Sequence, residues 1–122
     1  MFGNKPSLFS SKSATGETQA NRPAENVNWY HAIAYCNKLS LKESKEVCYS
    51  VIVSGTEVDW ETLKFSDIPI SSNDSWNATT CDFTKNGYRL PTEAEWEIAA
   101  RGGLTGDVYA GTATESELGD YA

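Results

Sequence analysis

The 122-residue sequence is poor in metal-binding and basic residues. It has one histidine and three cysteines, and its 10 lysines and arginines are outnumbered by 17 aspartates and glutamates, for a net charge of −7. Three irregularly spaced cysteines argue against a zinc ribbon or a disulfide-dense scaffold. The negative charge would repel phosphate backbones, and no basic face is evident, so we expect neither nucleic acid nor a membrane surface as a partner.

Long apolar segments are also missing. No run approaches the roughly 18 apolar residues of a membrane span, and no signal peptide is visible, so we expect no span and leave the location open. The hydrophobic content of 39% is enough for one folded domain. Charge is uneven: residues 1–56 carry six basic and four acidic side chains (net +2), while residues 57–122 carry four and thirteen (net −9).

The first half of the chain predicts a loop and then a helix. Residues 3–26 are rich in Ser, Thr, Gly, Asn and Pro, which is typical of a surface loop or arm. Apolar residues then recur with helical spacing, which predicts a helix over about 29–40 with Asn28 as its N-cap. His31 is expected to point to solvent. The expected inward stripe consists of Trp29, Ala32, Ile33, Cys36 and Leu39.

The middle of the chain predicts a strand, a long loop and a turn. Residues 48–53 are β-branched or aromatic and end at Ser54-Gly55, as expected of a short strand. Residues 54–80 are interpreted as a long loop held by a few buried anchors. Asn86-Gly87 predicts a tight turn between two flanking segments, because both residues tolerate a positive φ. The expected loop anchors are Trp60, Leu63, Phe65, Ile68, Ile70 and Trp76.

The best-specified element is a second helix within residues 90–103. Thr92 and Glu95 have the spacing of a capping box, and Gly102 suits a left-handed C-cap. The expected inward stripe of this helix is Trp96, Ala99 and Ala100. Residues 108–111 have the composition of the start of a further strand.

No active site emerges from these residues alone. Glu93, Glu95 and Glu97 are better explained by the positive helix N-terminus than by acid–base catalysis. For Cys36 and Cys48, buried thiols are favoured over a mutual disulfide, and nothing nearby would lower the pKa of either. Two glycosylation patterns, at Asn73 and Asn77, are interpreted as accidental. The sequence therefore assigns no catalytic, cofactor-binding or metal-ligating residue.

Three segments together resemble the formylglycine-generating enzyme (sulfatase-modifying factor) family. The segment NGYRLPTEAEWE at residues 86–97, followed by AARGG at 99–103, is similar to that family's second-helix signature. PAENVNWY at residues 23–30, continuing through AIAYCN at 32–37, resembles its first helix and lead-in. GNKPS at residues 3–7 resembles the segment just upstream.

The resemblance implies an α+β fold related to C-type lectins, with two helices, short strands and long irregular loops. It implies a partial domain over residues 1–122: a loop or arm at 1–26, the best-matched part at 28–103 and a truncated continuation at 104–122. Where the family has a Ser N-cap and an acidic residue three positions later, this chain has Asn28 and His31. A positive charge there would cost roughly 0.5 kcal/mol. Ala100 replaces a cysteine that forms a disulfide in some family enzymes.

The resemblance leaves two function classes open. In the first, the chain is part of an oxidoreductase domain, inactive by itself because the family's catalytic cysteine pair and calcium loops lie downstream of the second helix. In the second, it belongs to a non-catalytic, lectin-like ligand-binding module. Copper or non-haem iron, calcium, and a peptide substrate or small ligand are expected only for a complete domain. A downstream cysteine pair would favour the oxidase, and a variable aromatic and polar run would favour the binder.

Overall fold

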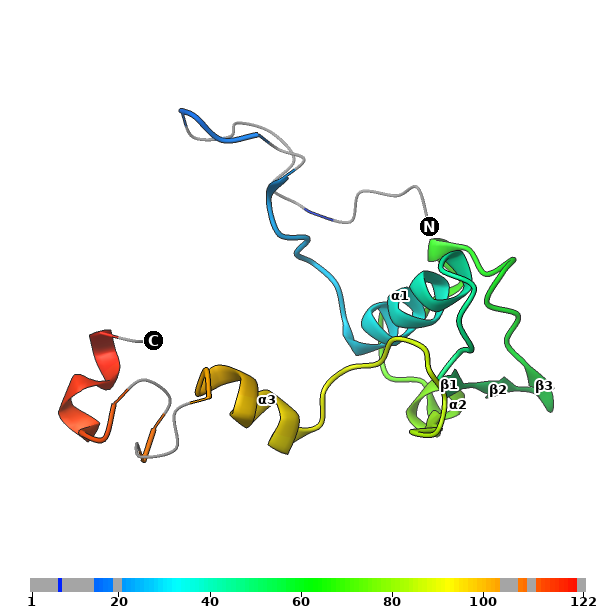
Figure 1. Cartoon of the computed structure of the whole chain (residues 1–122). Coiled ribbons are helices and arrows are strands. Elements are labelled where there is room, and N and C mark those ends of the chain that lie inside the picture. Colours follow the sequence, from blue (N-terminus) through cyan, green and yellow to red (C-terminus); the bar gives the residue numbers. More distant parts are fainter. Residues whose placement is uncertain (1–6, 8–14, 19–20, 104–107, 110–111, 121–122) are drawn as a thin grey trace. The chain divides into compact units, whose positions relative to one another are not determined.

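The computed structural model describes residues 7, 15–18, 21–103, 108–109 and 112–120. The chain divides into two compact units, Met1–Leu90 and Pro91–Ala122, each described here by itself (Figure 1). Among its described residues, the first unit contains the helices α1 (Trp29–Lys42) and α2 (Asp74–Asn77), a 3-10 helix (Phe65–Asp67) and four two-residue strands. The second contains α3 (Glu93–Ala100) and a 3-10 helix (Glu115–Asp120). Helices and short strands together confirm the α+β class.

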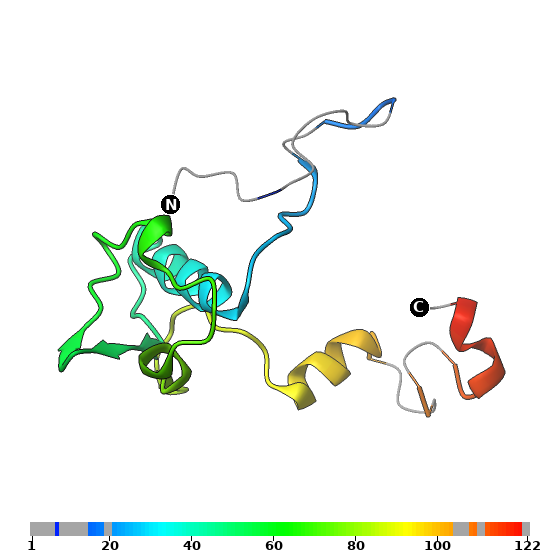
Figure 2. The same ribbon diagram turned by 180° about the vertical axis from the view of Figure 1, so that it is seen from behind.

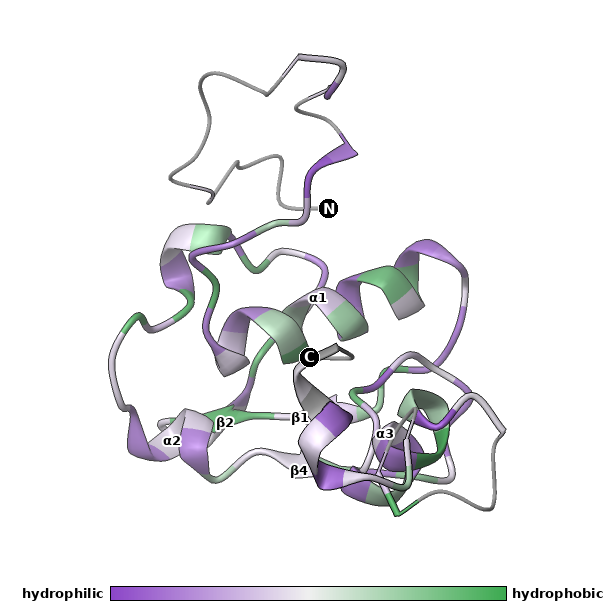
Figure 3. Cartoon of the chain, turned by 90° about the vertical axis from the view of Figure 1, so that its left-hand side faces the viewer, coloured by the Kyte–Doolittle hydropathy of each residue, from purple (hydrophilic) through white to green (hydrophobic). Residues whose placement is uncertain are grey.

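Helix α1 confirms the first predicted helix and extends it by two residues. The Asn28 side chain accepts a hydrogen bond from the backbone N–H of His31 at 3.0 Å, so Asn28 is the N-cap as predicted. Lys42 lies in the last turn, where its positive charge interacts favourably with the negative end of the helix dipole. The helix lies above β1 (Tyr49–Ser50) in Figures 1 and 3 and is in contact with it.

The buried face of α1 is only partly the predicted one. Ile33 and Cys36 are buried as expected, but Trp29 is 47% exposed, so its predicted burial is wrong. The fully buried positions include Asn37 and Ser40, which bond neighbouring backbone and are invisible to an apolar pattern. The whole buried set is Tyr30, His31, Ile33, Ala34, Cys36, Asn37 and Ser40.

The predicted strand at residues 48–53 is split between two small sheets. Strand β1 pairs antiparallel with β4 (Thr80–Cys81), whereas β2 (Ile52–Val53) pairs antiparallel with β3 (Thr56–Glu57). Ser54 and Gly55, with φ of 52° and 81°, make the tight turn between β2 and β3. Strand β2 is apolar yet exposed (Figure 3). The division occurs at Val51, which is fully buried and accepts a bond from Val58 N–H at 2.9 Å.

The segment 54–80 is largely irregular, as predicted, and supplies three buried anchors. Trp60, Ile68 and Trp76 are each at most 5% exposed, whereas the expected anchor Ile70 is 88% exposed. The short elements β3, α2 and the 3-10 helix were not predicted, because elements of two to four residues have no detectable hydrophobic period. Seen from behind, α2 lies below α1 (Figure 2). Tyr30 of α1 connects the two helices: its hydroxyl accepts from Asn73 N–H at 3.0 Å.

The core lies between α1, β1 and these loop anchors. Asn37 fastens α1 to the strand: its amide nitrogen donates to Tyr49 O at 2.7 Å, and its oxygen accepts from Cys48 N–H and Tyr49 N–H, both at 3.1 Å. The buried apolar cluster is Tyr30, Ile33, Ala34, Cys36, Cys48, Tyr49, Val51, Trp60, Ile68 and Trp76.

The predicted tight turn at Asn86-Gly87, with a positive φ at both residues, is wrong. The hydrogen-bonded turn lies earlier, where Lys85 N–H donates to Asp82 O, and Gly87 is not among the glycines with positive φ. Gly87 is instead required by close packing, because a Cβ atom there would lie 1.9 Å from Glu46 O. Asn86 accepts from Glu46 N–H at 3.0 Å and so holds the same contact.

Helix α3 confirms the second predicted helix and both of its end signals. Thr92 accepts from Glu95 N–H at 3.2 Å, and Glu95 accepts from Thr92 N–H at 2.9 Å, which completes the capping box. Gly102 follows the helix with φ of 58°. The predicted inward stripe is wrong within this unit: Trp96 is 61% exposed, and Ala99 and Ala100 are exposed. Within this unit α3 therefore has no buried side chain.

The rest of the second unit does not begin with a strand. Val108 and Tyr109 form a bend, and residues 110–111 of the predicted strand lie outside the described residues. Among the residues that the structure describes, no helix is long and apolar enough to cross a membrane.

Candidate functional site

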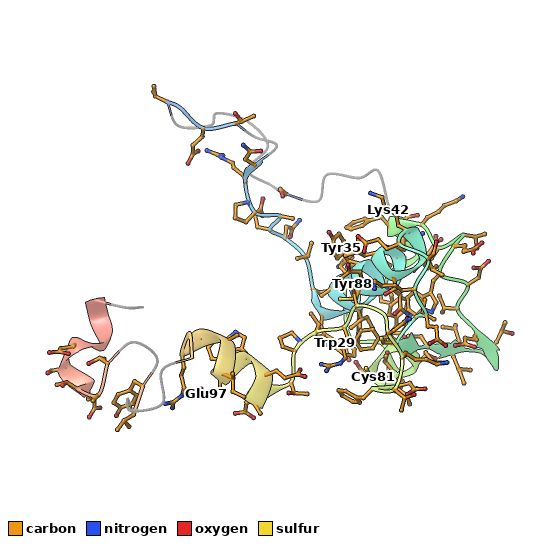
Figure 4. All side chains as sticks on the ribbon, viewed as in Figure 1. Trp29, Tyr35, Lys42, Cys81, Tyr88 and Glu97 are labelled. Atoms are coloured by element: carbon orange, nitrogen blue, oxygen red, sulfur yellow. The ribbon has the colours of Figure 1, made fainter. Side chains whose placement is uncertain are left out.

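The three cysteines are the first candidates for redox chemistry, and all three thiols are free. Cys36 on α1 and Cys48 beside β1 belong to the buried core, while Cys81 on β4 is partly exposed (Figure 4). The prediction of buried thiols rather than a Cys36–Cys48 disulfide is confirmed. Burial raises the pKa of both Cys36 and Cys81 above the ordinary thiol value. Both therefore stay protonated near neutral pH, where a thiolate is needed for nucleophilic attack or metal binding.

The acidic residues of α3 serve the helix itself. Glu95 completes the capping box, and Glu97 forms an ion pair with Arg101 at 2.6 Å, one turn further along (Figure 4). Glu95 and Glu97 thus make contacts within the helix, and Glu93 lies in its first turn, where a negative charge is favourable. Within the part of the chain that the structure describes, no three His, Cys, Asp or Glu side chains gather in a position to hold a metal ion.

The two glycosylation patterns lie at α2. Asn73 is the N-cap of this helix and accepts from Trp76 N–H at 3.2 Å. Asn77 donates to Ser72 Oγ at 3.2 Å and accepts from the Tyr30 hydroxyl. Both side chains thus have structural roles at the contact between α1 and α2.

A pocket of about 390 Å³ opens at the N-terminal end of α1. We call it the α1 groove, and its lining residues are Asn26, Val27, Asn28, His31, Phe65 and Ile70. A second pocket of about 280 Å³ shares Asn28 and Ile70 with it. The combined surface is apolar and open, because Val27 and Trp29 are each 47% exposed and Ile70 is 88% exposed. Volumes of this size are common among small-molecule sites.

Asn28 connects the two sides of the α1 groove. Its amide nitrogen donates to Pro69 O at 2.8 Å, while its oxygen caps α1. Both ends of the amide are therefore committed to the fold. The cap thus also fixes the segment that carries Ile70 beside the start of the helix.

The predicted solvent exposure of His31 is wrong. The residue is 6% exposed rather than solvent-facing, and its ring stacks on Phe65 with centroids 4.4 Å apart and planes 25° apart. Its Nδ1 accepts from Asn28 N–H at 3.2 Å, completing the capping box that a Glu or Gln ordinarily completes. Burial lowers the pKa of His31 below 6.5, so the ring is neutral and the expected charge penalty at the helix start does not arise.

Sequence reasoning missed this role of His31, although a signal existed. A residue able to accept a hydrogen bond three positions after an Asn N-cap has capping-box spacing, and neutral imidazole has one acceptor nitrogen. What the sequence could not show was Phe65, which lies 34 positions further along the chain and covers the ring.

The chain matches known proteins over nearly its full length. The family model "Sulfatase-modifying factor enzyme 1-like domain" matches residues 3–121. The structure is similar to Treponema denticola variable protein 1, with a TM-score of 0.86 and 55% identity, over 98% of this chain and 43% of that one.

Two sequence relatives differ in what they are named for. The chaperone protein LppX of Paenibacillus barcinonensis is 37% identical over 99% of this chain and 38% of its own length. The formylglycine-generating enzyme of Streptomyces coelicolor is 64% identical over 36 residues, which is 30% of this chain and 12% of that enzyme. Where nearly the whole of this chain is matched, it thus spans about two fifths of the relative's own length.

Proposed function

Because the chain belongs to the sulfatase-modifying factor enzyme 1-like family, we propose that it forms the scaffold part of such a domain and by itself oxidises no peptide cysteine. The observation that carries this proposal is the state of the thiols. Cys36 and Cys48 are built into the core, and burial keeps Cys36 and Cys81 protonated. Formylglycine formation in the resembled family uses a reactive cysteine pair, and the thiols here do not fit that role.

The donor set also does not fit a resident copper ion. Copper(I) prefers converging thiolate or thioether sulfurs, and protonated, core-packed thiols are poor donors. The one histidine is capping α1 through Nδ1 and is stacked on Phe65. We therefore assign no metal to these residues, and any copper, non-haem iron or calcium is proposed for a complete domain only.

The second candidate function is a non-catalytic, lectin-like ligand-binding module. The likeness to a solved protein named for its variability extends over 98% of this chain, whereas the named enzyme from Streptomyces matches over 30% of it. The open apolar α1 groove offers a place for a ligand. A peptide substrate or a small ligand of the complete domain remains the partner class that we propose.

One experiment tests the catalytic part of this proposal. The full 122-residue chain is incubated with copper(I), oxygen, a thiol reductant and a sulfatase-motif peptide, and mass spectrometry follows formation of the aldehyde. A variant with Cys36, Cys48 and Cys81 all changed to serine is the matched control. We expect product at the level of that control and no stoichiometric copper. Turnover above the control would show that these thiols are an active site.

A further inference from the structure

The contacts of His31 at the start of α1 require a neutral imidazole. Its Nδ1 accepts a hydrogen bond from Asn28 N–H at 3.2 Å, and its ring stacks on Phe65 with centroids 4.4 Å apart. Because Nδ1 accepts, the neutral ring carries its proton on Nε2, and the proton that makes the ring cationic must bind Nδ1. That proton would meet the Asn28 N–H head-on, so protonation replaces an attractive contact by a repulsive one.

The surroundings of the ring offer a cation no compensation. The other residues that line the α1 groove carry no formal charge, and the positive end of the helix dipole lies at the start of α1. The nearest titratable side chains along α1, its lead-in and the 3-10 helix are Glu25, Tyr30, Tyr35, Lys64 and Asp67. None of them shifts the pKa of His31, for which burial is the only cause. Asp67 instead accepts from Lys64 N–H at 3.0 Å within its own 3-10 helix. A buried charge without a partner is costly, so a protonated ring is driven toward water.

We propose that His31 is a pH switch for the α1 groove: on protonation its ring turns out to solvent, which frees the Asn28 N–H and separates the ring from Phe65. The change is local, because Ile68 is 3% exposed and keeps the segment after Phe65 anchored in the core. Since the open form binds the proton much better than the closed one, the ratio of open to closed form rises about tenfold per pH unit below about pH 6.5. This inference is independent of the proposal on catalysis, because none of the three cysteines lines the groove.

NMR of the full chain labelled with ¹⁵N tests the switch between about pH 8 and pH 5, the range in which histidine titrates. At the upper end we expect a proton on Nε2 of His31 and none on Nδ1. On acidification the ring nitrogens and the amides of Asn28 and Phe65 should change together, along one titration curve with its midpoint below about pH 6.5. The amides of Cys48 and Tyr49, which are hydrogen-bonded in the core, should stay unchanged over the same transition.

Three variants separate the switch from the fold. H31Q keeps an acceptor for the capping box but takes up no proton in this range, so α1 should stay capped and the transition should disappear. F65A removes the ring that covers the imidazole, so the midpoint should rise toward about pH 6.5. F83A is the matched control: Phe83 is 61% exposed and does not line the groove, so the midpoint should be that of the wild type.

Several results would overturn the proposal. A proton on Nδ1 at the upper end of the range would remove its premise, as would a ring that stays neutral throughout. Titration of the ring without change at Asn28 and Phe65 would show that the cation is tolerated in place. Loss of the Cys48 and Tyr49 amides at the same midpoint would mean that acid unfolds the whole unit. The same transition in H31Q would show that another group drives it.

Discussion

Replacing Asn37 by alanine should remove a large part of the stability of the first unit. The side chain is fully buried and makes three hydrogen bonds, at 2.7, 3.1 and 3.1 Å, to the backbone of Cys48 and Tyr49. The variant leaves two N–H groups and one carbonyl unpaired, and each buried unpaired group costs about 1–3 kcal/mol. Partial relaxation and water entry reduce the sum, so we expect a loss of roughly 3–5 kcal/mol, compared with about 5–15 kcal/mol for a whole native domain.

Urea unfolding, followed by tryptophan fluorescence and far-ultraviolet circular dichroism, measures this loss. N37L restores side-chain volume without hydrogen bonds and should be about as destabilised as N37A, which separates lost bonds from lost packing. N86A removes an amide that accepts one backbone bond at an exposed position, so it should cost less than about 1 kcal/mol. The reasoning is refuted if N37A and N37L both lose less than about 1 kcal/mol, or if N86A loses as much as either.

The remaining predictions concern packing, pH and association. G87A should unfold the first unit or displace residues 46 and 87, since its Cβ would lie 1.9 Å from Glu46 O; a wild-type urea midpoint in G87A would contradict the close contact. Because burial lowers the pKa of folded His31 below the unfolded value near 6.5, the unfolded state binds more protons at acid pH. Stability should be complete above about pH 6.5 and fall below it by up to about 1.4 kcal/mol per pH unit until the folded pKa is reached, and H31Q should lack this dependence. The full chain should be marginally stable and self-associating, because Trp29 and Trp96 and the apolar strand β2 are exposed. Dye binding and a broad thermal transition that depends on concentration are expected, whereas a sharp, reversible transition of a monomer would oppose this.

The helices and their ends were predictable because the relevant contacts are local. Asn28 caps α1 through the N–H three positions later, and Thr92 and Glu95 satisfy each other's backbone within one turn. Gly102 takes a positive φ directly after α3. These signals depend on residues within four positions of each other, so a single sequence contains all the information that they need.

The candidate site was predictable only in part. The sequence identified His31 and Asn28 as neighbours at the start of a helix, but it predicted an exposed and unfavourable imidazole. Phe65 stacks on that ring from a segment without regular hydrophobic spacing, and this contact decides both its burial and its neutrality. The free thiols of Cys36 and Cys48 were predicted correctly from their places on the inward face of a helix and at the start of a strand.

Long-range packing decided the rest. The pairing of β1 with β4 joins residues about 30 positions apart, so the split at Val51 has no local signal. The exposure of Trp29 and the burial of Asn37 reverse what hydropathy predicts, because Asn37 satisfies three backbone groups that would otherwise be buried unpaired. The sequence predicted a turn at Gly87, whereas in the structure the lack of a side chain there allows close approach to Glu46. Local hydrogen bonds thus determined the helices from the sequence alone. The burial of His31 and Asn37 and the close approach of Gly87 to Glu46 depend on partners that only the folded chain brings together.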